Sequence, residues 1–578
     1  MNNIWTLRAV ACATLAATGV SVWAQAPSSL PIVDPAATQR NIEQGLGNLQ
    51  QPVQPLPQQP RAAAPAAQAE ADIQKLVGVQ VQTPSQLPKL AQQIEDYWLQ
   101  FLQKPVRGVQ VNEFKSWLWD QLQRQGYLGY ITVQPQTEAD GTLLRIAVQA
   151  PTIGRATVLT LDAQEQDPLA NLVAQRFAKA YPEGTLVDVQ GIEAQLSAIA
   201  YDLPVNLEAS LRQVGSEKVD VVINLKRVDA APGKVTSAVV QLNNYGLKTY
   251  SREMANTVIR VAGPTPLSEF VGVAQVAKGV VYLSGQYSQP IEGWASRWKL
   301  FGTAVESKTD ATQPSDSQRY TQRGQSYLLG ANISTLLRAN RYGTWHSLIG
   351  LNYRESKGDL TMHNTGVTAT TRDRRDNQVV FGLRSDHKLP YADKLVVETN
   401  INMGHLKLKP LDTSYNQPDA VAHLQGNYQF LSQEGLFQKA LPADERWTFT
   451  ARWGLQFASQ NLDGKHKFAL GGVNAIRAFD SDEGVGDEGV LVLLDLQRYI
   501  NPDFYAGVFY DAGRVRTNKK PSSSSYSLQG AGVSMGGKVN TQVEWKMSVA
   551  KSHGSTPAQG INGKIGDWRA YFSTNWRY

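Results

Sequence analysis

The chain has 578 residues, a formal net charge of +6 at pH 7 and 18% charged residues. This length exceeds that of one ordinary domain, so at least two folded units are expected. Charges of both signs are spread along the chain without a basic cluster. The sequence therefore lacks the feature that is typical of nucleic-acid-binding proteins. We therefore expect no nucleic-acid partner.

The first 26 residues have the pattern of a secretory signal peptide. A basic residue precedes an apolar stretch at 9–22, and small residues allow cleavage after Ala24 or Ala26. The stretch is shorter than the ~20 residues of a membrane-spanning helix, so an N-terminal anchor is the weaker alternative. The single cysteine, Cys12, lies inside it, and the exported chain is therefore expected to be free of disulfides.

An N-terminal segment at 27–50 follows, and its pattern predicts one short polar helix at 35–50, with Pro35 near the first turn. Residues 51–72 are rich in Pro, Gln and Ala, a composition typical of a semi-extended linker. Two interpretations of the helix stay open. It is either a tethered element that moves relative to the rest of the chain or part of a disordered leader.

Residues 73–230 indicate two consecutive small α+β units, at 73–150 and 151–230, with the same order of elements. The first is predicted to contain a strand at 73–82, helices at 87–103 and 112–125, and hairpin strands at 130–136 and 142–150. The second is predicted to contain a strand at 156–161, helices at 168–180 and 189–199, and strands at 206–213 and 218–227. Exposed edges of such small sheets are natural docking sites for an extended peptide.

The remaining residues, 231–578, indicate a membrane barrel. Segments of about ten residues alternate apolar and polar side chains, most clearly at 447–457, where Trp, Phe, Ala and Leu share one face. Apolar and aromatic residues on one face with charged residues on the other fit lipid outside and a wet lumen inside. No segment after the signal peptide approaches ~18 consecutive apolar residues, so strands and not helices are expected to cross the membrane.

We count sixteen such strands, an even number that returns the chain to its starting side. They begin near residues 235, 254, 267, 280, 295, 326, 345, 377, 394, 420, 446, 490, 504, 526, 540 and 568. Long polar connections follow odd-numbered strands, at 306–325, 355–376, 404–419, 458–489 and 551–567. Connections after even-numbered strands are mostly short, with 433–445 as the longest exception. The fold class is thus a transmembrane antiparallel β-barrel of 16 strands.

The connection at 458–489 contains a Gly-rich stretch, 471–479, whose only basic residue is Arg477. The alternation along the strand from 504 places Asp511 on the lumen face. We hypothesise that the loop folds into the lumen and that Arg477 pairs with Asp511 there. Removing one partner of such a pair would leave the other charge uncompensated. The alternative is that both are solvated lumen charges.

Enzyme signals are weak. A Gly-x-Ser-x-Gly match at 532–536 contains Ser534, but a strand follows it where a hydrolase needs a sharp turn and a helix. The seven histidines are scattered singly without metal-ligand spacing. We therefore predict a protein that is not an enzyme, with no catalytic residue, no metal and no cofactor.

Three motifs carry a resemblance to the two-partner secretion transporters, the TpsB family. Residues 242–246 (Leu-Asn-Asn-Tyr-Gly) resemble the family's Asp-Asn-x-Gly signature through Asn243, Asn244 and Gly246, with Asn243 where Asp is usual. Residues 476–479 (Ile-Arg-Ala-Phe) resemble its Val-Arg-Gly-Phe/Tyr loop tip. Phe509, Asp511 and Gly513 match its Phe-x-Asp-x-Gly pattern.

The resemblance implies that Arg477 and Phe479 of the loop lock onto Phe509, Asp511 and Gly513 of the barrel. Ala478 stands where the family has Gly. This replacement puts in doubt a tight turn that needs positive φ there.

The resemblance covers nearly the whole chain and implies a plug helix, a linker, two polypeptide-transport-associated (POTRA) domains in the periplasm and a barrel in the bacterial outer membrane. It implies that an unfolded large TpsA-like exoprotein with an N-terminal secretion domain, of the haemolysin or haemagglutinin kind, is the cargo. Outer-membrane lipid and the barrel-assembly machinery are the other implied partners.

Three alternatives stay open. A barrel-assembly factor of the same superfamily typically has more than two periplasmic domains. A passive porin lacks them. An enzyme barrel of the membrane surface would need a Ser/His/Asp set.

Overall fold

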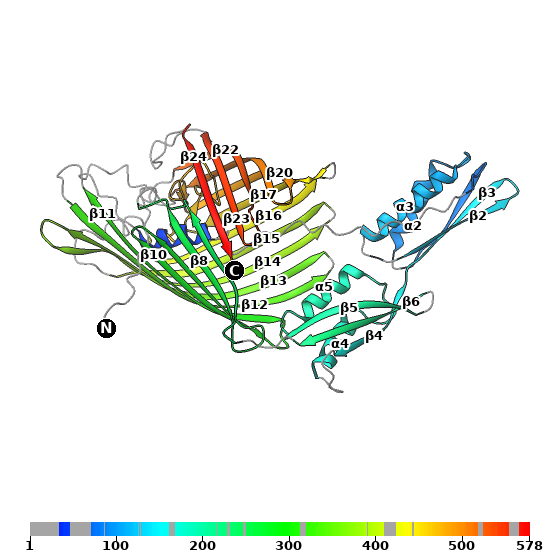
Figure 1. The fold of residues 1–578 in the computed structure, drawn as a ribbon, viewed down its shortest axis with the longest axis horizontal. Coiled ribbons are helices and arrows are strands. Elements are labelled where there is room, and N and C mark those ends of the chain that lie inside the picture. Colours follow the sequence, from blue (N-terminus) through cyan, green and yellow to red (C-terminus); the bar gives the residue numbers. More distant parts are fainter. Residues whose placement is uncertain are drawn as a thin grey trace. The chain divides into compact units, whose positions relative to one another are not determined.

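The computed structural model describes residues 34–46, 71–85, 87–124, 127, 129–160, 168–214, 217–227, 232–246, 250–312, 319–340, 342–389, 391–409, 424–441, 444–517, 524–553 and 566–578. The predicted signal peptide, its cleavage sites and the linker up to residue 70 lie outside the described residues. The chain forms two compact units (Figure 1). One holds the two small domains, and the other holds an N-terminal helix and the barrel.

The first small domain is a three-stranded sheet with two helices. Its elements are β1 (Leu76–Gln82), α2 (Pro88–Leu99), α3 (Gly108–Arg124), β2 (Tyr130–Glu138) and β3 (Gly141–Gln149). The strand order is β1-β3-β2, with β1 parallel to β3. Trp98 and Phe114 from the helices are fully buried and pack with Leu144 of the sheet. This aromatic core explains how a domain of under 80 residues stays folded.

Helix α3 begins at Gly108, and the predicted start at Asn112 is wrong. The backbone amide of Gly108 donates to Oδ1 of Asp72 at 2.7 Å. A carboxylate from 36 residues earlier therefore caps the helix. Local sequence cannot show such a long-range cap.

The second small domain repeats this arrangement. Its elements are β4 (Thr152–Thr160), α4 (Pro168–Ala180), α5 (Val189–Ile199), β5 (Val205–Val214) and β6 (Lys218–Arg227). The strand order is β4-β6-β5, which leaves β5 at an edge of the sheet. Both helices have the predicted bounds. Asp188 caps α5 by accepting from the amide of Gly191 at 3.0 Å.

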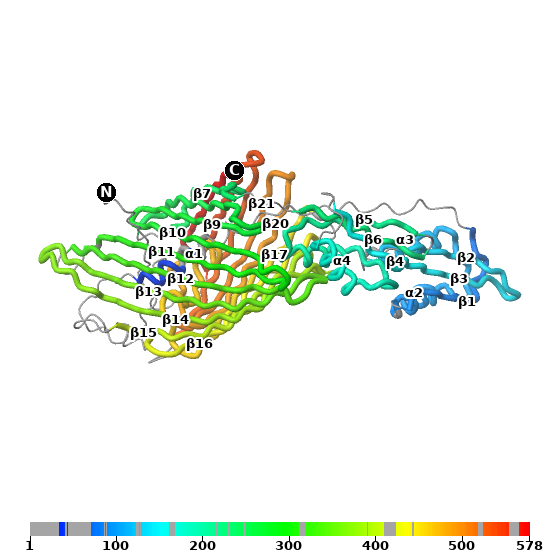
Figure 2. Tube along the Cα trace, turned by 90° about the horizontal axis from the view of Figure 1, so that it is seen from below, coloured from blue at the N-terminus to red at the C-terminus, as the bar shows by residue number. Residues whose placement is uncertain are grey.

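The second unit is a closed barrel of sixteen strands, which confirms the predicted fold class and strand count (Figure 2). The first strand, β7, pairs with the last, β24. The strands are β7 (Val235–Asn243), β8 (Met254–Ala262), β9 (Glu269–Ala277), β10 (Val280–Ile291), β11 (Ser296–Thr312), β12 (Arg319–Asn340), β13 (Gly343–Met362), β14 (Thr368–Leu389), β15 (Ala392–Leu408), β16 (Gly426–Leu441), β17 (Asp444–Ala458), β20 (Glu488–Asn501), β21 (Phe504–Arg516), β22 (Ser525–Lys538), β23 (Val543–His553) and β24 (Trp568–Arg577).

Several strands are longer than predicted. β12 has 22 residues, a length of roughly 70 Å at ~3.3 Å per residue, whereas a tilted strand crosses a bilayer in ~9–11 residues. The described parts of the predicted loops at 306–325 and 355–376 are mostly strand. Backbone hydrogen bonds between the strands continue beyond the membrane, where neither face of the sheet has to be apolar. The predicted inner loop at 433–445 is also wrong, since β16 continues to Leu441.

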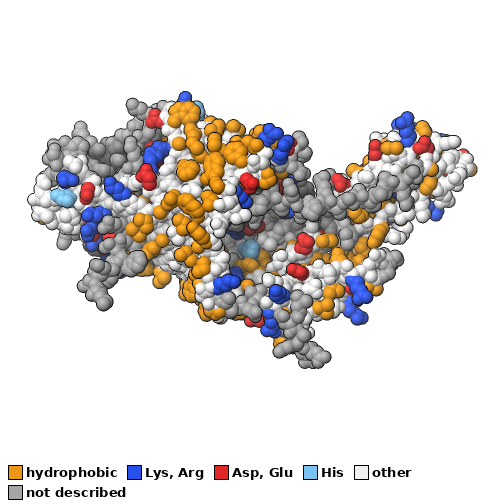
Figure 3. Space-filling view, viewed as in Figure 1, with side chains coloured by type: hydrophobic (Ala, Val, Ile, Leu, Met, Phe, Trp, Pro, Cys, Tyr) orange, Lys and Arg blue, Asp and Glu red, His pale blue; other side chains and the backbone are white. Residues whose placement is uncertain are grey.

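The two faces of the barrel wall differ as the alternation predicted. Along β21, the side chains of Val508 and Tyr510 are exposed on the outer face, whereas Phe509 and Asp511 are buried on the lumen side. Hydrophobic side chains gather over the outside of the barrel wall (Figure 3). Exposed aromatic residues such as Tyr578 mark the periplasmic rim. Among the described residues, no helix is long and apolar enough to cross a membrane.

Helix α1 (Pro35–Leu46) lies inside the barrel, against the lumen wall (Figure 2). The helix was predicted to reach residue 50, and residues 47–50 lie outside the described residues. Its first turns are buried, including the polar side chains of Thr38 and Gln39. A polar helix is buried here because the lumen wall around it is polar as well.

Candidate functional site

The connection between β17 and β20 folds into the lumen, and we call residues 459–487 the lumen loop. Two short strands, β18 (Phe468–Ala469) and β19 (Val485–Gly486), pair at its base. Near its tip, the amide of Ile476 donates to the carbonyl of Leu470 at 2.7 Å. Gly472 takes the positive φ of 121° that this turn needs. The loop is thus a compact hairpin and not a loose connection.

Arg477 at the loop tip contacts Asp511 of β21, the partner that strand parity placed opposite it. Its Nε donates to Oδ2 of Asp511 at 2.9 Å and its Nη2 donates to Oδ1 at 2.6 Å. The backbone amide of Arg477 donates to the same carboxylate at 3.0 Å. Such a bidentate pair fixes orientation as well as charge.

Two further side chains complete the surroundings of Arg477. Its Nη1 donates to Oδ1 of Asp495 on β20 at 2.7 Å, and its guanidinium lies 3.5 Å from the ring centre of Phe509. Burial alone would lower the pKa of Arg477, but the hydrogen bonds and charges of Asp511 and Asp495 raise it above its ordinary value. Sequence reasoning missed Asp495. Phe509 of the motif thus makes a cation–π contact with the guanidinium of Arg477.

An apolar layer lies beneath the tip. Phe479 is 1% exposed and packs in a cluster with Leu470 and Ile476 of the loop and with residues of β20 to β22. Gly513 of β21 makes room for it, because a Cβ there would lie 2.5 Å from Cδ2 of Leu470. The glycine of the motif is thus required for packing, because the absence of a side chain leaves a recess in the wall into which the loop fits.

Ala478 does not adopt a positive φ, since it is absent from the described non-glycine residues that do so. The expected difficulty with a tight turn therefore does not arise. Its methyl group faces Gly530 of β22, where an added Cβ would lie 2.6 Å from Cβ of Ala478. The need for glycine at position 530 could not be predicted from the sequence, because it arises from contact with Ala478, which lies 52 positions away.

The first-strand signature lies where the barrel closes. The side chain of Asn244 donates to the carbonyl of Ala570 and accepts from the amide of Phe572, both on β24. Asn243 accepts from the amide of Tyr245 at 2.9 Å, as an aspartate also could. Its amide group also donates to Gln241 at 2.7 Å, which a carboxylate cannot do.

The glycine of this signature is required by space. The amide of Gly246 donates to the carbonyl of Arg252 at 2.9 Å across the turn from β7 to β8. A Cβ at this position would overlap the carbonyl of Ser251. A larger residue would therefore push the turn apart.

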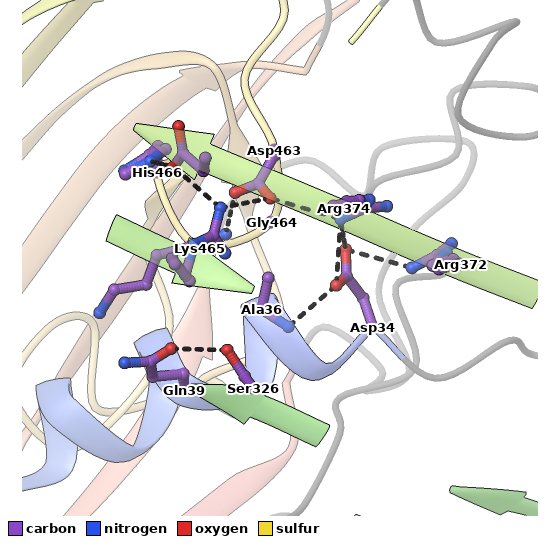
Figure 4. Close-up of polar contacts among 12 residues, drawn as sticks. Asp34, Ala36, Gln39, Ser326, Arg372, Arg374, Asp463, Gly464, Lys465 and His466 are labelled. Atoms are coloured by element: carbon purple, nitrogen blue, oxygen red, sulfur yellow. Dashed lines mark hydrogen bonds and ion pairs between the residues drawn. The ribbon is translucent and has the colours of Figure 1, made fainter. Parts of the chain in front are cut away.

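Helix α1 is held by a buried charge cluster at its N-terminus (Figure 4). Asp34 contacts Arg374 at 3.0 Å and Arg372 at 3.1 Å, both on β14, and accepts from the amide of Ala36. Burial would raise the pKa of Asp34, but the two guanidinium groups hold it well below its ordinary value. Arg374 also lies 3.5 Å from Asp463 of the lumen loop.

The helix also rests on the base of the lumen loop. Arg40 donates to the carbonyl of Gly464 at 2.9 Å, and Lys465 pairs with Glu43. A Cβ on Gly464 would lie 3.0 Å from Cβ of Ala37, so this glycine lets the two backbones approach. The lumen loop thus contacts α1 at its base and the wall at its tip. Sequence reasoning did not find the contact of the helix with the loop.

The loop base is tied to β13 and β14 by a further buried network, which shares Asp463 with the charge cluster of α1. Arg354 of β13 donates to Asp463 at 2.6 Å and to Asp376 at 3.1 Å. His466 and Tyr428 both contact the carboxylate of Asp376, each at 2.7 Å. Since each charge faces an opposite one, the network can hold the loop in place within the lumen.

The serine of the Gly-x-Ser-x-Gly match is not placed as in a hydrolase. Ser534 lies within β22, in a strand and not on an elbow between a strand and a helix. Within the described ranges, no group of three or more histidine, cysteine or carboxylate side chains is placed to hold a metal ion. The arrangement positions a loop and a helix inside a pore.

A family model described as haemolysin secretion/activation protein ShlB/FhaC/HecB matches residues 221–539, more than half of the chain. Among solved structures, CdiB from Escherichia coli is similar with a TM-score of 0.56 and 16% identity, covering 95% of this chain and 100% of that one. CdiB from Acinetobacter baumannii is similar with a TM-score of 0.54 and 14% identity, covering 94% and 99%. At these identities the likeness to solved structures shows the fold alone. No curated protein matches the chain in sequence.

Proposed function

The chain belongs to the ShlB/FhaC/HecB family of haemolysin secretion/activation proteins, outer-membrane transporters of the two-partner secretion class, and we propose that it exports one large exoprotein from the periplasm. The two small domains recognise the unfolded cargo, and the barrel conducts it. The observation that carries the proposal is a closed sixteen-strand barrel whose lumen holds a helix and a tethered loop.

The edge strand β5 supports recognition by β-augmentation. Within the described residues it pairs only with β6, and Leu211 and Val214 are exposed on it. Its sequence contains no proline, so every backbone amide that points away from β6 can donate to an added strand. The edge strand β2 of the first domain contains Pro135, which lacks a donor and makes β2 the poorer template.

Charges on the lumen wall support passage of an unfolded chain. Arg452 pairs with Asp495 at 3.5 Å, and Arg577 pairs with Glu544 at 3.0 Å, each across neighbouring or nearby strands. A wall of paired charges keeps the lumen wet, and it offers little apolar surface to which an unfolded polypeptide could adhere. The lumen loop and α1 obstruct the resting pore, and cargo passage requires α1 at least to move.

A secretion assay tests the proposal. The cargo to use is the very large β-helical exoprotein expected from the neighbouring reading frame, expressed with and without this protein. We expect export only in its presence. Unchanged export in its absence would overturn the proposal. A general loss of other outer-membrane barrels instead would indicate a barrel-assembly factor.

Site-specific photo-crosslinking tests the recognition step. A crosslinker at Leu211 of β5 is expected to capture the secretion domain of the cargo. The control is Leu159 of β4, which is also exposed but belongs to the other edge of the same sheet. Equal capture at both positions would contradict augmentation at β5.

A further inference from the structure

The barrel closes through a short seam. β7 and β24 are joined by five residue pairs, from Asn243 with Ser573 to Val239 with Arg577, whereas β23 and β24 are joined by nine. Residues 568–572 of β24 extend beyond the end of β7 on the side that faces away from the periplasm. Backbone hydrogen bonds between Ala238 and Tyr578, and from the amide of Asn244 to the carbonyl of Phe572, extend the ladder slightly at its two ends. The seam is still shorter than the pairing of β23 with β24, so side-chain contacts add to its closure.

Side chains replace part of the missing ladder. Asn244 donates from Nδ2 to the carbonyl of Ala570 at 3.0 Å and accepts at Oδ1 from the amide of Phe572 at 2.7 Å. Its amide group thus pairs with β24 as a strand backbone would. The ring of Tyr245 packs edge-on against Tyr571, with the ring centres 5.7 Å apart.

The tip of the lumen loop adds contacts on both sides of this seam. On one side, the hydroxyl of Tyr571 on β24 donates to the carbonyl of Phe479 at 2.9 Å, and Asp480 pairs with Arg569 of β24. On the other side, Nη2 of Arg252, two residues before β8, donates to Asp480 at 3.3 Å. β7 lies between these two partners.

We propose that the lumen loop is a clasp on the barrel seam and that Asp480 is its positioning residue. One carboxylate joins the last strand to the hairpin formed by β7 and β8. Arg477 anchors the same loop on β20 and β21, so the docked loop spans the wall from β20 to the start of β8. Closure of the seam therefore depends on docking of the loop. This inference rests on the barrel alone and not on the cargo.

Backbone amide exchange on the full-length protein in lipid nanodiscs tests the clasp. Asp480→Asn is expected to speed exchange roughly tenfold in 235–243 and 568–577, a change of about 1.4 kcal/mol in local opening. Exchange in β22, residues 525–538, is expected to stay unchanged because this strand is away from the seam. Ser481→Ala, one residue further along the loop, is the matched control and leaves both regions as in the wild type.

Two more variants make the outcome decisive. Asp480→Glu retains the charge and is expected to restore most of the protection at the seam. Arg569→Gln removes the same contact from the side of β24. It must therefore speed amide exchange in the same two segments, and it provides the test if the Asp480→Asn protein does not insert into the membrane. Heat-modifiable migration on gels checks that each barrel is folded.

Wild-type exchange at the seam in both Asp480→Asn and Arg569→Gln overturns the proposal. Equal acceleration in β22 also overturns it, because Asp480 would then support the barrel generally. All of these measurements omit the cargo. A failed clasp is therefore distinct from a failed secretion assay.

Discussion

Replacing Arg477 by alanine removes the central contact of the lumen loop. The guanidinium makes three hydrogen bonds, at 2.9 and 2.6 Å to Asp511 and at 2.7 Å to Asp495. The side chains of Arg477, Asp511 and Asp495 are 7%, 0% and 4% exposed. Removing one partner of a buried ion pair costs ~3–5 kcal/mol, and because two carboxylates are left here we expect about 4–5 kcal/mol. This corresponds to a shift of roughly a thousandfold from the docked to the undocked loop.

Amide exchange in residues 470–479 measures this shift, because Gly472, Ile476 and Phe479 donate hydrogen bonds within the docked loop. Arg477→Lys is the matched control. It retains one positive charge but cannot make the bidentate pair, so an intermediate value is expected. Exchange within twofold of the wild type in Arg477→Ala would refute the reasoning, since the apolar layer under the tip would then hold the loop by itself. Export that survives charge reversal, Arg477→Glu, would refute the functional role of the lock.

Three other predictions concern the same lumen. Deleting residues 35–46 should raise the ion conductance of the reconstituted barrel, and unchanged conductance would argue that the helix is not a plug. Gly530→Ala should destabilise the docked loop by ~1–3 kcal/mol through overpacking, and Ala478→Gly should rescue it in the same exchange assay; no rescue would contradict the contact. Burial and neighbouring carboxylates raise the pKa of Asp482 in the loop from 3.8 to about 7. The neutral carboxyl of Asp482 therefore stabilises the docked loop relative to the charged form. This stabilisation is fully present below pH ~4 and is lost as the pH rises through about 7. Loop exchange should be faster at pH 8 than at pH 5.5, and Asp482→Asn should remove the difference.

The sequence was sufficient to predict the sixteen strands and the bounds of α4 and α5. Because lipid lies outside and water inside, apolar and polar side chains must alternate along each membrane-crossing strand. This pattern can be recognised in a single sequence. The same logic placed Asp511 in the lumen opposite the loop. Where strands leave the membrane the constraint ends, and the ends of β11 to β14 could not be predicted.

Asp495 could not be found for a related reason. The segment before it, 490–494, is a continuous apolar run, so strand parity was hidden. The structure explains the run, because the lumen face at Leu491 and Leu493 is covered by the apolar underside of the lumen loop. The charge cluster of α1 was also invisible, since Asp34 and Arg374 are 340 residues apart.

The position of Arg374 between Asp34 and Asp463 has a consequence for opening the pore. If α1 leaves the lumen as proposed, Arg374 loses Asp34 but keeps the carboxylate of Asp463 3.5 Å away on the loop base. Arg372 loses its contact with Asp34, at 3.1 Å, in the same step. We therefore expect the loop base to compensate the charge of Arg374 after the helix departs, which lowers the free-energy cost of opening the pore.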